Sequence, residues 1–274
     1  MREQETGGVS KDRDKFAVLH AARRVWAVAA IHGEAERLAR LQTNLARRLE
    51  PGDRLVYLGN YLGRGRQIRE TLDHLLHFRR WLLARPRSFA YDVAYLRGGQ
   101  EEMWQKLLQI QFAPNPREVL GWMLNQGVGA TLAAYGGEPR QGEAAARDGA
   151  MAMTRWSGAL RAAMQAIPGH FQLMSALRRA AFTDDHSLLF VSAGLDPERP
   201  LSEQSDSFWW GGAGFAQLAA YGDFGRVVRG HDRGQAGLAS GPFSTTIDGG
   251  CGFGGSLVAA CFLPSGDADD LIEA

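Results

Sequence analysis

The sequence RLVYLGNYLGRG (residues 54–65) joins a short apolar run to a glycine-rich loop. The run reads as a buried strand over Arg54–Leu58, and the loop leads into a helix expected from about residue 66 to 84. Further strands that end in glycine are expected on either side, over 25–31 and 91–96. This order of strand, loop and helix indicates an α/β fold whose ligand site lies at the carboxyl ends of the strands.

The composition excludes several classes of protein. The 274 residues carry 31 basic and 30 acidic side chains, and a net charge of +1 gives no support to nucleic-acid binding. No apolar run approaches the 18 or so residues that cross a bilayer, and the polar N-terminus lacks a signal-peptide core. Cys251 and Cys261 form neither a disulfide framework nor a metal motif. We therefore expect a cytoplasmic protein with no membrane or nucleic-acid partner.

The chain is expected to form one domain. Residues 1–15 read as a disordered tail, and residues 16–274 as a single domain with a helical insertion at about 102–181. The tryptophans of that insertion, at 104, 122 and 156, are expected to pack in its core. Shorter strands return over 187–191, 226–228, 244–247 and 256–263, as in a mixed or antiparallel second sheet.

Five glycine-containing loops follow expected strands. In order along the chain they are AAIHG (29–33), GNYLGRG (59–65), RGGQE (97–101), VSAG (191–194) and RGHD (229–232). Their order and spacing resemble the calcineurin-like metallophosphoesterases, in particular the bacterial serine/threonine phosphatase and diadenosine-tetraphosphatase-like branch. The motifs of that family run GDxHG, GDYVDRG, GNHE, VHAG and GH. The resemblance covers roughly residues 24–265 and implies an α/β two-sheet αββα sandwich with a helical insertion.

The resemblance also implies a site with two divalent metals bridged by a carboxylate. In this sequence only His32 and His231 match the six metal-ligand positions of the family. The other four positions hold a different residue: Ala30, Asn60, Gly99 and Ser192. Two adjacent dications repel strongly, so the neutral Asn60 at the bridging position removes what stabilises the pair.

The acid-base machinery is also replaced. The family's proposed general acid, a histidine, corresponds to Gln100, and the aspartate that orients it corresponds to Gly63. An amide has no titratable proton to give to a leaving group. We therefore expect no intact catalytic residue and no cofactor, or at most one weakly held Mn, Fe or Zn ion. Asp196 and Asp232 are the residues that could supply oxygen ligands in compensation.

Part of a phosphate site remains. Arg64 matches the family's phosphate-contacting arginine, and it precedes a helix N-terminus that favours anions. One hypothesis is a metal-free pocket for a phosphorylated ligand, formed by Arg64, Asn60, His32 and His231. The alternative is that Arg64 forms a structural ion pair, for example with Glu101, and that the histidines are core residues. Arg97 ends a strand beside the same site.

Three weaker patterns favour a structural role. The sequence GCGFGG (250–255) fits a dinucleotide fingerprint, but the segment after it reads as a strand rather than a helix. His74 and His77 stand three residues apart on an expected helix, where a solvated face is the simpler interpretation. The aromatic run at 208–210 is expected to pack, although it could also form the edge of a partner or substrate site.

These observations favour a catalytically degenerate phosphatase, or pseudophosphatase. Its expected role is a regulatory or binding module for a phosphorylated ligand or a protein partner. The alternative is an active phosphoesterase, either a protein phosphatase or a nucleotide hydrolase, with a rebuilt metal site. A structural subunit of a larger assembly is a third possibility.

Overall fold

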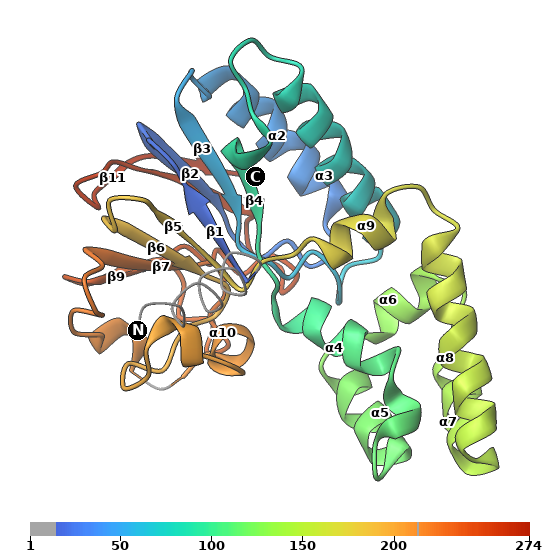
Figure 1. Cartoon of the computed structure of the whole chain (residues 1–274). Helices are drawn as coiled ribbons and strands as arrows, with labels where there is room; N and C mark the ends of the chain where they lie inside the picture. Colours follow the sequence, from blue (N-terminus) through green and yellow to red (C-terminus); the bar gives the residue numbers. More distant parts are fainter. Residues whose placement is uncertain (1–14, 213) are drawn as a thin grey trace, which may run out of the picture.

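The computed structural model describes residues 15–212 and 214–274. Two β-sheets pack face to face, and helices cover their outer faces (Figure 1). The expected αββα sandwich is therefore confirmed. Apart from Lys15, the tail expected at residues 1–15 lies outside the described residues.

The five-stranded sheet has the order β11-β10-β2-β3-β4. Its strands are β2 (Arg24–Val28), β3 (Asp53–Tyr57), β4 (Val93–Tyr95), β10 (Val258–Phe262) and β11 (Ala268–Glu273). The three strands β2, β3 and β4 are parallel, whereas β10 is antiparallel to both of its neighbours. The carboxyl ends of the three parallel strands consequently meet at one edge of the sheet.

Two amphipathic helices cover the outer face of this sheet (Figure 1). They are α2 (Ala35–Arg48) and α3 (Ile68–Leu83). Leu38, Leu41 and Leu45 recur at helical spacing and are fully buried, so α2 presents one apolar stripe to the sheet. The strand β2 alternates accordingly, because Trp26 packs with the helices while its neighbour Ala27 packs between the sheets.

The six-stranded sheet has the order β1-β5-β6-β7-β9-β8 and is mixed. Its strands are β1 (Phe16–Leu19), β5 (Ala180–Thr183), β6 (Leu188–Val191), β7 (Arg226–Arg229), β8 (Ala239–Ser240) and β9 (Ser244–Thr246). Between the sheets, the buried rings of Phe190 and Phe262 lie 6.1 Å apart. On the outer face, the short helix α10 (Ser207–Trp210) contributes Phe208 and Trp209 to a third apolar cluster.

A helical segment connects β4 to β5 and stands away from the sheets (Figure 1). Its helices are α4 (Gly99–Leu107), α5 (Pro116–Asn125), α6 (Gly129–Ala134), α7 (Pro139–Asp148), α8 (Ala150–Gln165) and α9 (His170–Ser175). The expected end of the insertion at 181 falls inside β5, because Ala180–Thr183 pairs with both β1 and β6. Among the described residues, no helix combines the length and the apolarity that a bilayer crossing requires.

Candidate functional site

The loops after β2, β3, β4 and β7 surround a pocket of about 190 Å³, which we call the anion pocket. The four residues expected to bind a ligand, His32, Asn60, Arg64 and His231, all line it. Further lining residues that were not expected from the sequence are Gln126, Arg233, Gln235 and Phe253. Arg233 and Gln235 directly follow the RGHD motif in one loop, and Phe253 lies within GCGFGG, but neither motif by itself indicates that these side chains line the site.

The backbone fixes the pocket's shape. Four of the seven described non-glycine residues with positive φ line the pocket: His32, Asn60, Arg64 and Gln235. A non-glycine residue in this conformation is strained by about 1 kcal/mol or more, and such residues concentrate at functional sites. The loops also bind each other, since the backbone N–H of His32 donates to the carbonyl of Asn60 and that of Gly65 to the carbonyl of His32.

Glu101 fastens two of these loops together. Its buried carboxylate accepts three backbone N–H groups, from Asn60 at 2.8 Å, Gly98 at 2.9 Å and Leu62 at 3.0 Å. Burial raises the pKa of Glu101, and these hydrogen bonds oppose the rise. The hypothesis that Glu101 pairs with Arg64 is therefore wrong, because both carboxylate oxygens of Glu101 accept hydrogen bonds from backbone N–H groups instead.

Arg64 faces the pocket as a cation. Its guanidinium lies over the ring of Phe253, with 3.9 Å between the guanidinium carbon and the ring centroid. Within residues 15–212 and 214–274, no carboxylate forms an ion pair with it. Partial burial lowers the pKa of Arg64, but a guanidinium keeps its charge in proteins.

His231 is held by Asp248, a residue that the sequence interpretation missed. Nδ1 of His231 lies 3.2 Å from Oδ2 of Asp248, which leaves Nε2 as the other polar atom of the ring. Burial acts to raise the pKa of Asp248. The hydrogen bonds from His231 and from the backbone N–H groups of Asp232 and Gly250 more than offset this, so the pKa lies below its ordinary value. The signal for Asp248 in the sequence was a carboxylate directly after a strand and before Gly249-Gly250.

His32 is buried, and neither of its ring nitrogens has a hydrogen-bond partner among residues 15–212 and 214–274. Its ring lies 5.3 Å from that of His231 and 5.5 Å from that of Phe253. Burial, with His231 and Arg64 nearby, lowers the pKa of His32 from 6.5 to about 3. His32 is consequently a neutral, buried ring in the wall of the pocket.

The residues present do not fit a two-metal centre. Oδ1 of Asn60 accepts the backbone N–H of Gln100 at 3.0 Å, so the remaining terminal atom of Asn60 is the Nδ2 donor. A Cβ at Gly99 would lie 2.9 Å from Cζ3 of Trp210, so the indole takes the place of a ligand side chain there. No group of three or more His, Cys, Asp or Glu side chains suited to a metal occurs in the described part of the chain.

The other residues considered as metal ligands either bind other groups of the protein or lie outside the anion pocket. Asp232 pairs with Arg229 at 3.2 Å and accepts the N–H groups of Gly234 and Ala236, while Asp196 pairs with Arg199 at 3.2 Å. Ala30 and Ser192 are buried and do not line the pocket. Arg97 pairs with Glu102 at 3.2 Å and lines a different cavity.

The electrostatics of the pocket favour an anion. Its lining contains two cations, Arg64 and Arg233, and no carboxylate. The neutral ring of His32, the ring of His231 and amide side chains complete its polar part. Aromatic and sulfur-containing side chains complete the wall: Met103, Trp209, Trp210 and Phe253. The aromatic run at 208–210 packs, and its last two residues also border the pocket.

Trp122 was expected to pack in the core of the helical insertion. This expectation was wrong, since the side chain is 45% exposed.

Comparison with known proteins identifies the fold. No family model and no curated protein sequence matches the chain. A crystal structure of a protein provisionally assigned as a diadenosine tetraphosphatase superposes with a TM-score of 0.59 and 19% identity, over 95% of this chain and 98% of that chain. A cold-active protein tyrosine phosphatase superposes with a TM-score of 0.52 and 12% identity, over 98% and 86% of the two chains. The fold is that of the calcineurin-like metallophosphoesterases, and identities this low show the fold alone.

Proposed function

We propose that the protein is a catalytically silent member of the metallophosphoesterase fold that binds a phosphate ester without a metal. It then acts as a regulatory or binding module through the ligand that it holds. The observation that carries the proposal is the lining of the anion pocket, which offers two arginines, two histidines and no carboxylate. In the resembled family the same place holds acidic residues, which attract cations.

The pocket residues offer complementary contacts to a phosphoryl group. Arg64 has five N–H donors and no carboxylate partner in the described residues, and charge-assisted hydrogen bonds to phosphate are the strongest that it can form. Nδ2 of Asn60 is a further donor at the pocket, which His231 also lines. Arg233, which is exposed and also lacks a carboxylate partner in the described residues, adds long-range attraction.

The size of the pocket limits what enters it. A volume of about 190 Å³ is below the 300–1,000 Å³ that is usual for drug-sized ligands, so the pocket accepts the phosphoryl end of a ligand rather than a whole nucleotide. The solved structures with this fold include proteins named for action on a dinucleotide polyphosphate and on phosphotyrosine. The ligand is thus a phosphorylated protein side chain or a small phosphate ester. Both carry the phosphoryl group that the pocket recognises.

Turnover is disfavoured by the same residues. Nε2 of Gln100 donates to the carbonyl of Gln126 at 2.8 Å, and an amide supplies no titratable proton for a leaving group. Asn60 and Gly99 do not supply the donors that a bridged metal pair needs. Binding is therefore retained where acid catalysis and metal activation are lost.

Calorimetric titration with inorganic phosphate tests the proposal. We expect Arg64→Gln to weaken phosphate binding about ten-fold or more, because a charge-assisted contact is removed. Arg66→Gln is the matched control, since Arg66 is exposed two residues away and does not line the pocket. Titration with a phosphotyrosine peptide and with AMP then distinguishes the two sources of the phosphoryl group.

The competing function is an active phosphoesterase with a rebuilt metal site. It predicts near-stoichiometric Mn, Fe or Zn in the purified protein and metal-dependent hydrolysis of an aryl phosphate that His231→Ala abolishes. That result would overturn our proposal, as would the absence of phosphate binding by the unaltered protein. Phosphate binding without turnover, with or without added Mn²⁺, supports it.

A further inference from the structure

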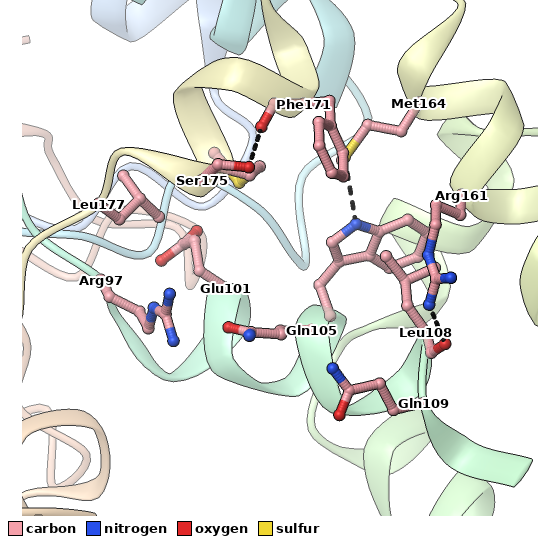
Figure 2. A pocket seen from close by; sticks show the side chains of 12 residues that line it. Arg97, Glu101, Gln105, Leu108, Gln109, Arg161, Met164, Phe171, Ser175 and Leu177 are labelled. Atoms are coloured by element: carbon pink, nitrogen blue, oxygen red, sulfur yellow. Dashed lines mark hydrogen bonds between the residues drawn. The ribbon is translucent and has the colours of Figure 1, made fainter.

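A second, larger cavity lies where the helical segment joins the sandwich. It has a volume of about 580 Å³, within the range that is usual for small-molecule sites. Helix α4 forms one side, and α8 and α9 form the other, as Figure 2 shows. Nothing in the proposed phosphate-binding function uses this cavity.

The walls of the cavity are mainly apolar. Trp104 of α4 is one lining residue. Leu108 lies on the α4 side, while Met164 and Phe171 face it from α8 and α9 (Figure 2). Nε1 of Trp104 is held 3.4 Å from Sδ of Met164, which fixes the indole within the wall. Aromatic and thioether side chains of this kind suit a flat apolar ligand, because methionine adapts its shape to what it contacts.

One cation at the cavity has no acidic partner. Arg161 uses Nη2 to donate to the backbone carbonyl of Leu108 at 2.8 Å, and it forms no ion pair within the described ranges. The other charged side chains that line the cavity already have partners within the protein. Arg97 pairs with Glu102, and the carboxylate of Glu101 accepts the three backbone N–H groups described above.

We propose that this cavity binds a small organic acid. The flat apolar body of the ligand lies against the partly exposed ring of Phe171, and its carboxylate pairs with Arg161. The guanidinium can do so without giving up its contact with Leu108, because it has five N–H donors. Charge complementarity and the apolar walls together define this ligand class.

Titration of the full-length protein with 2-naphthoate and its neutral analogue 2-naphthamide tests the assignment. The two compounds share a ring system and differ in charge. We expect the unaltered protein to bind naphthoate about ten-fold more tightly than naphthamide, since a charged hydrogen bond is added. Arg161→Gln should remove this preference, whereas Arg161→Lys should retain part of it.

Two further variants separate binding from folding. Arg155→Gln removes the same charge from an exposed position of α8 outside the cavity, and it should leave the preference intact. Ser175→Trp, at an exposed position of the lining, should block both compounds while phosphate titration remains unchanged. Equal affinity for the two compounds, an unchanged preference in Arg161→Gln, or no binding of naphthoate would each overturn the proposal.

Discussion

The side chain of Gln100 fills the space in which a side chain at position 63 would begin. A Cβ added to Gly63 would collide with the Oε1, Cδ and Cγ atoms of Gln100, whose Nε2 is anchored on the carbonyl of Gln126. The glycine at position 63 and the glutamine at position 100 therefore form one packing arrangement, in which a single amide side chain fills the space beside both backbones.

This arrangement predicts coupled effects on stability. Gly63→Ala should lower the free energy of unfolding by about 2 kcal/mol for two reasons. The new Cβ collides with Gln100, and a residue with a side chain is strained at the φ of +80° that Gly63 adopts. Adding Gln100→Ala should restore about 1 kcal/mol of that loss, measured by urea unfolding. Gly158→Ala, where a Cβ meets nothing within 4 Å, is the control and should not destabilise the protein. Strictly additive losses at positions 63 and 100 would contradict the arrangement.

Restoring the family's metal ligands should fail while Trp210 is present. The indole would lie 2.9 Å from a Cβ at position 99, so an asparagine there has no room to reach a metal. The restored variant combines Ala30→Asp, Asn60→Asp, Gly63→Asp, Gly99→Asn, Gln100→His and Ser192→His. We expect elemental analysis to find little Mn in it, and more once Trp210→Ala is added.

The control for this experiment is Trp122→Ala in the restored variant. Trp122 packs edge-on against Trp210 with 5.6 Å between the ring centroids, but it does not lie against Gly99. Its removal should leave the metal content low. A restored variant that binds two equivalents of Mn with Trp210 in place would show that the indole does not obstruct the site.

Glu101→Gln should destabilise the protein although it changes few atoms. One of its two oxygens becomes an amide nitrogen, which cannot accept the N–H groups that Glu101 now receives. Leaving buried donors unpaired costs about 1–3 kcal/mol each, so we expect a loss of about 2 kcal/mol or more in thermal or urea unfolding. Glu143→Gln on the exposed side of α7 should change the stability by less than about 0.5 kcal/mol. Equal effects of the two substitutions would refute the role of Glu101.

Acid should destabilise the protein partly through His32. The pKa of His32 falls from 6.5 to about 3 on folding, so between these values the unfolded state binds a proton that the folded state does not. Its contribution is fully present above pH 6.5 and is lost as the pH falls toward 3. In His32→Asn, the slope of unfolding free energy against pH in this window should decrease by up to about 1.4 kcal/mol per pH unit. Asparagine tolerates the positive φ of this position.

The strands that could be predicted are those with a local apolar signal. β2 and β3 are continuous buried runs that end in glycine loops, and nothing in their sequences competes with a strand. The helical insertion was expected to extend to about residue 181, which overlaps the start of β5 (Ala180–Thr183). These residues form a strand because they pair with β1 and β6. β1 lies far away in the sequence and β6 is itself short, so neither gives a local signal for β5. β11 was missed since most of its residues are exposed.

Part of the lining of the anion pocket could be predicted where a motif occupies the loop after a strand, as for His32, Asn60, Arg64 and His231. What surrounds these residues depends on contacts between distant segments. Trp210 fills the space beside Gly99, although the two residues are more than a hundred positions apart in the sequence. Asp248 contacts His231 from another loop. The position of Asp248 after a strand marks it as a candidate site residue, but local spacing does not identify the distant residue that either side chain contacts.

The left-handed residues of the anion pocket have a consequence for engineering. Because His32, Asn60, Arg64 and Gln235 hold a left-handed backbone conformation, the frame of the pocket is set partly by the backbone and not by its lining side chains alone. A rigid backbone that holds functional groups in fixed positions is what a designed catalyst or sensor requires. Pocket residues such as Arg233, which bear neither this strain nor loop-fastening hydrogen bonds in the described structure, are the positions at which a new specificity could be installed without rebuilding the scaffold.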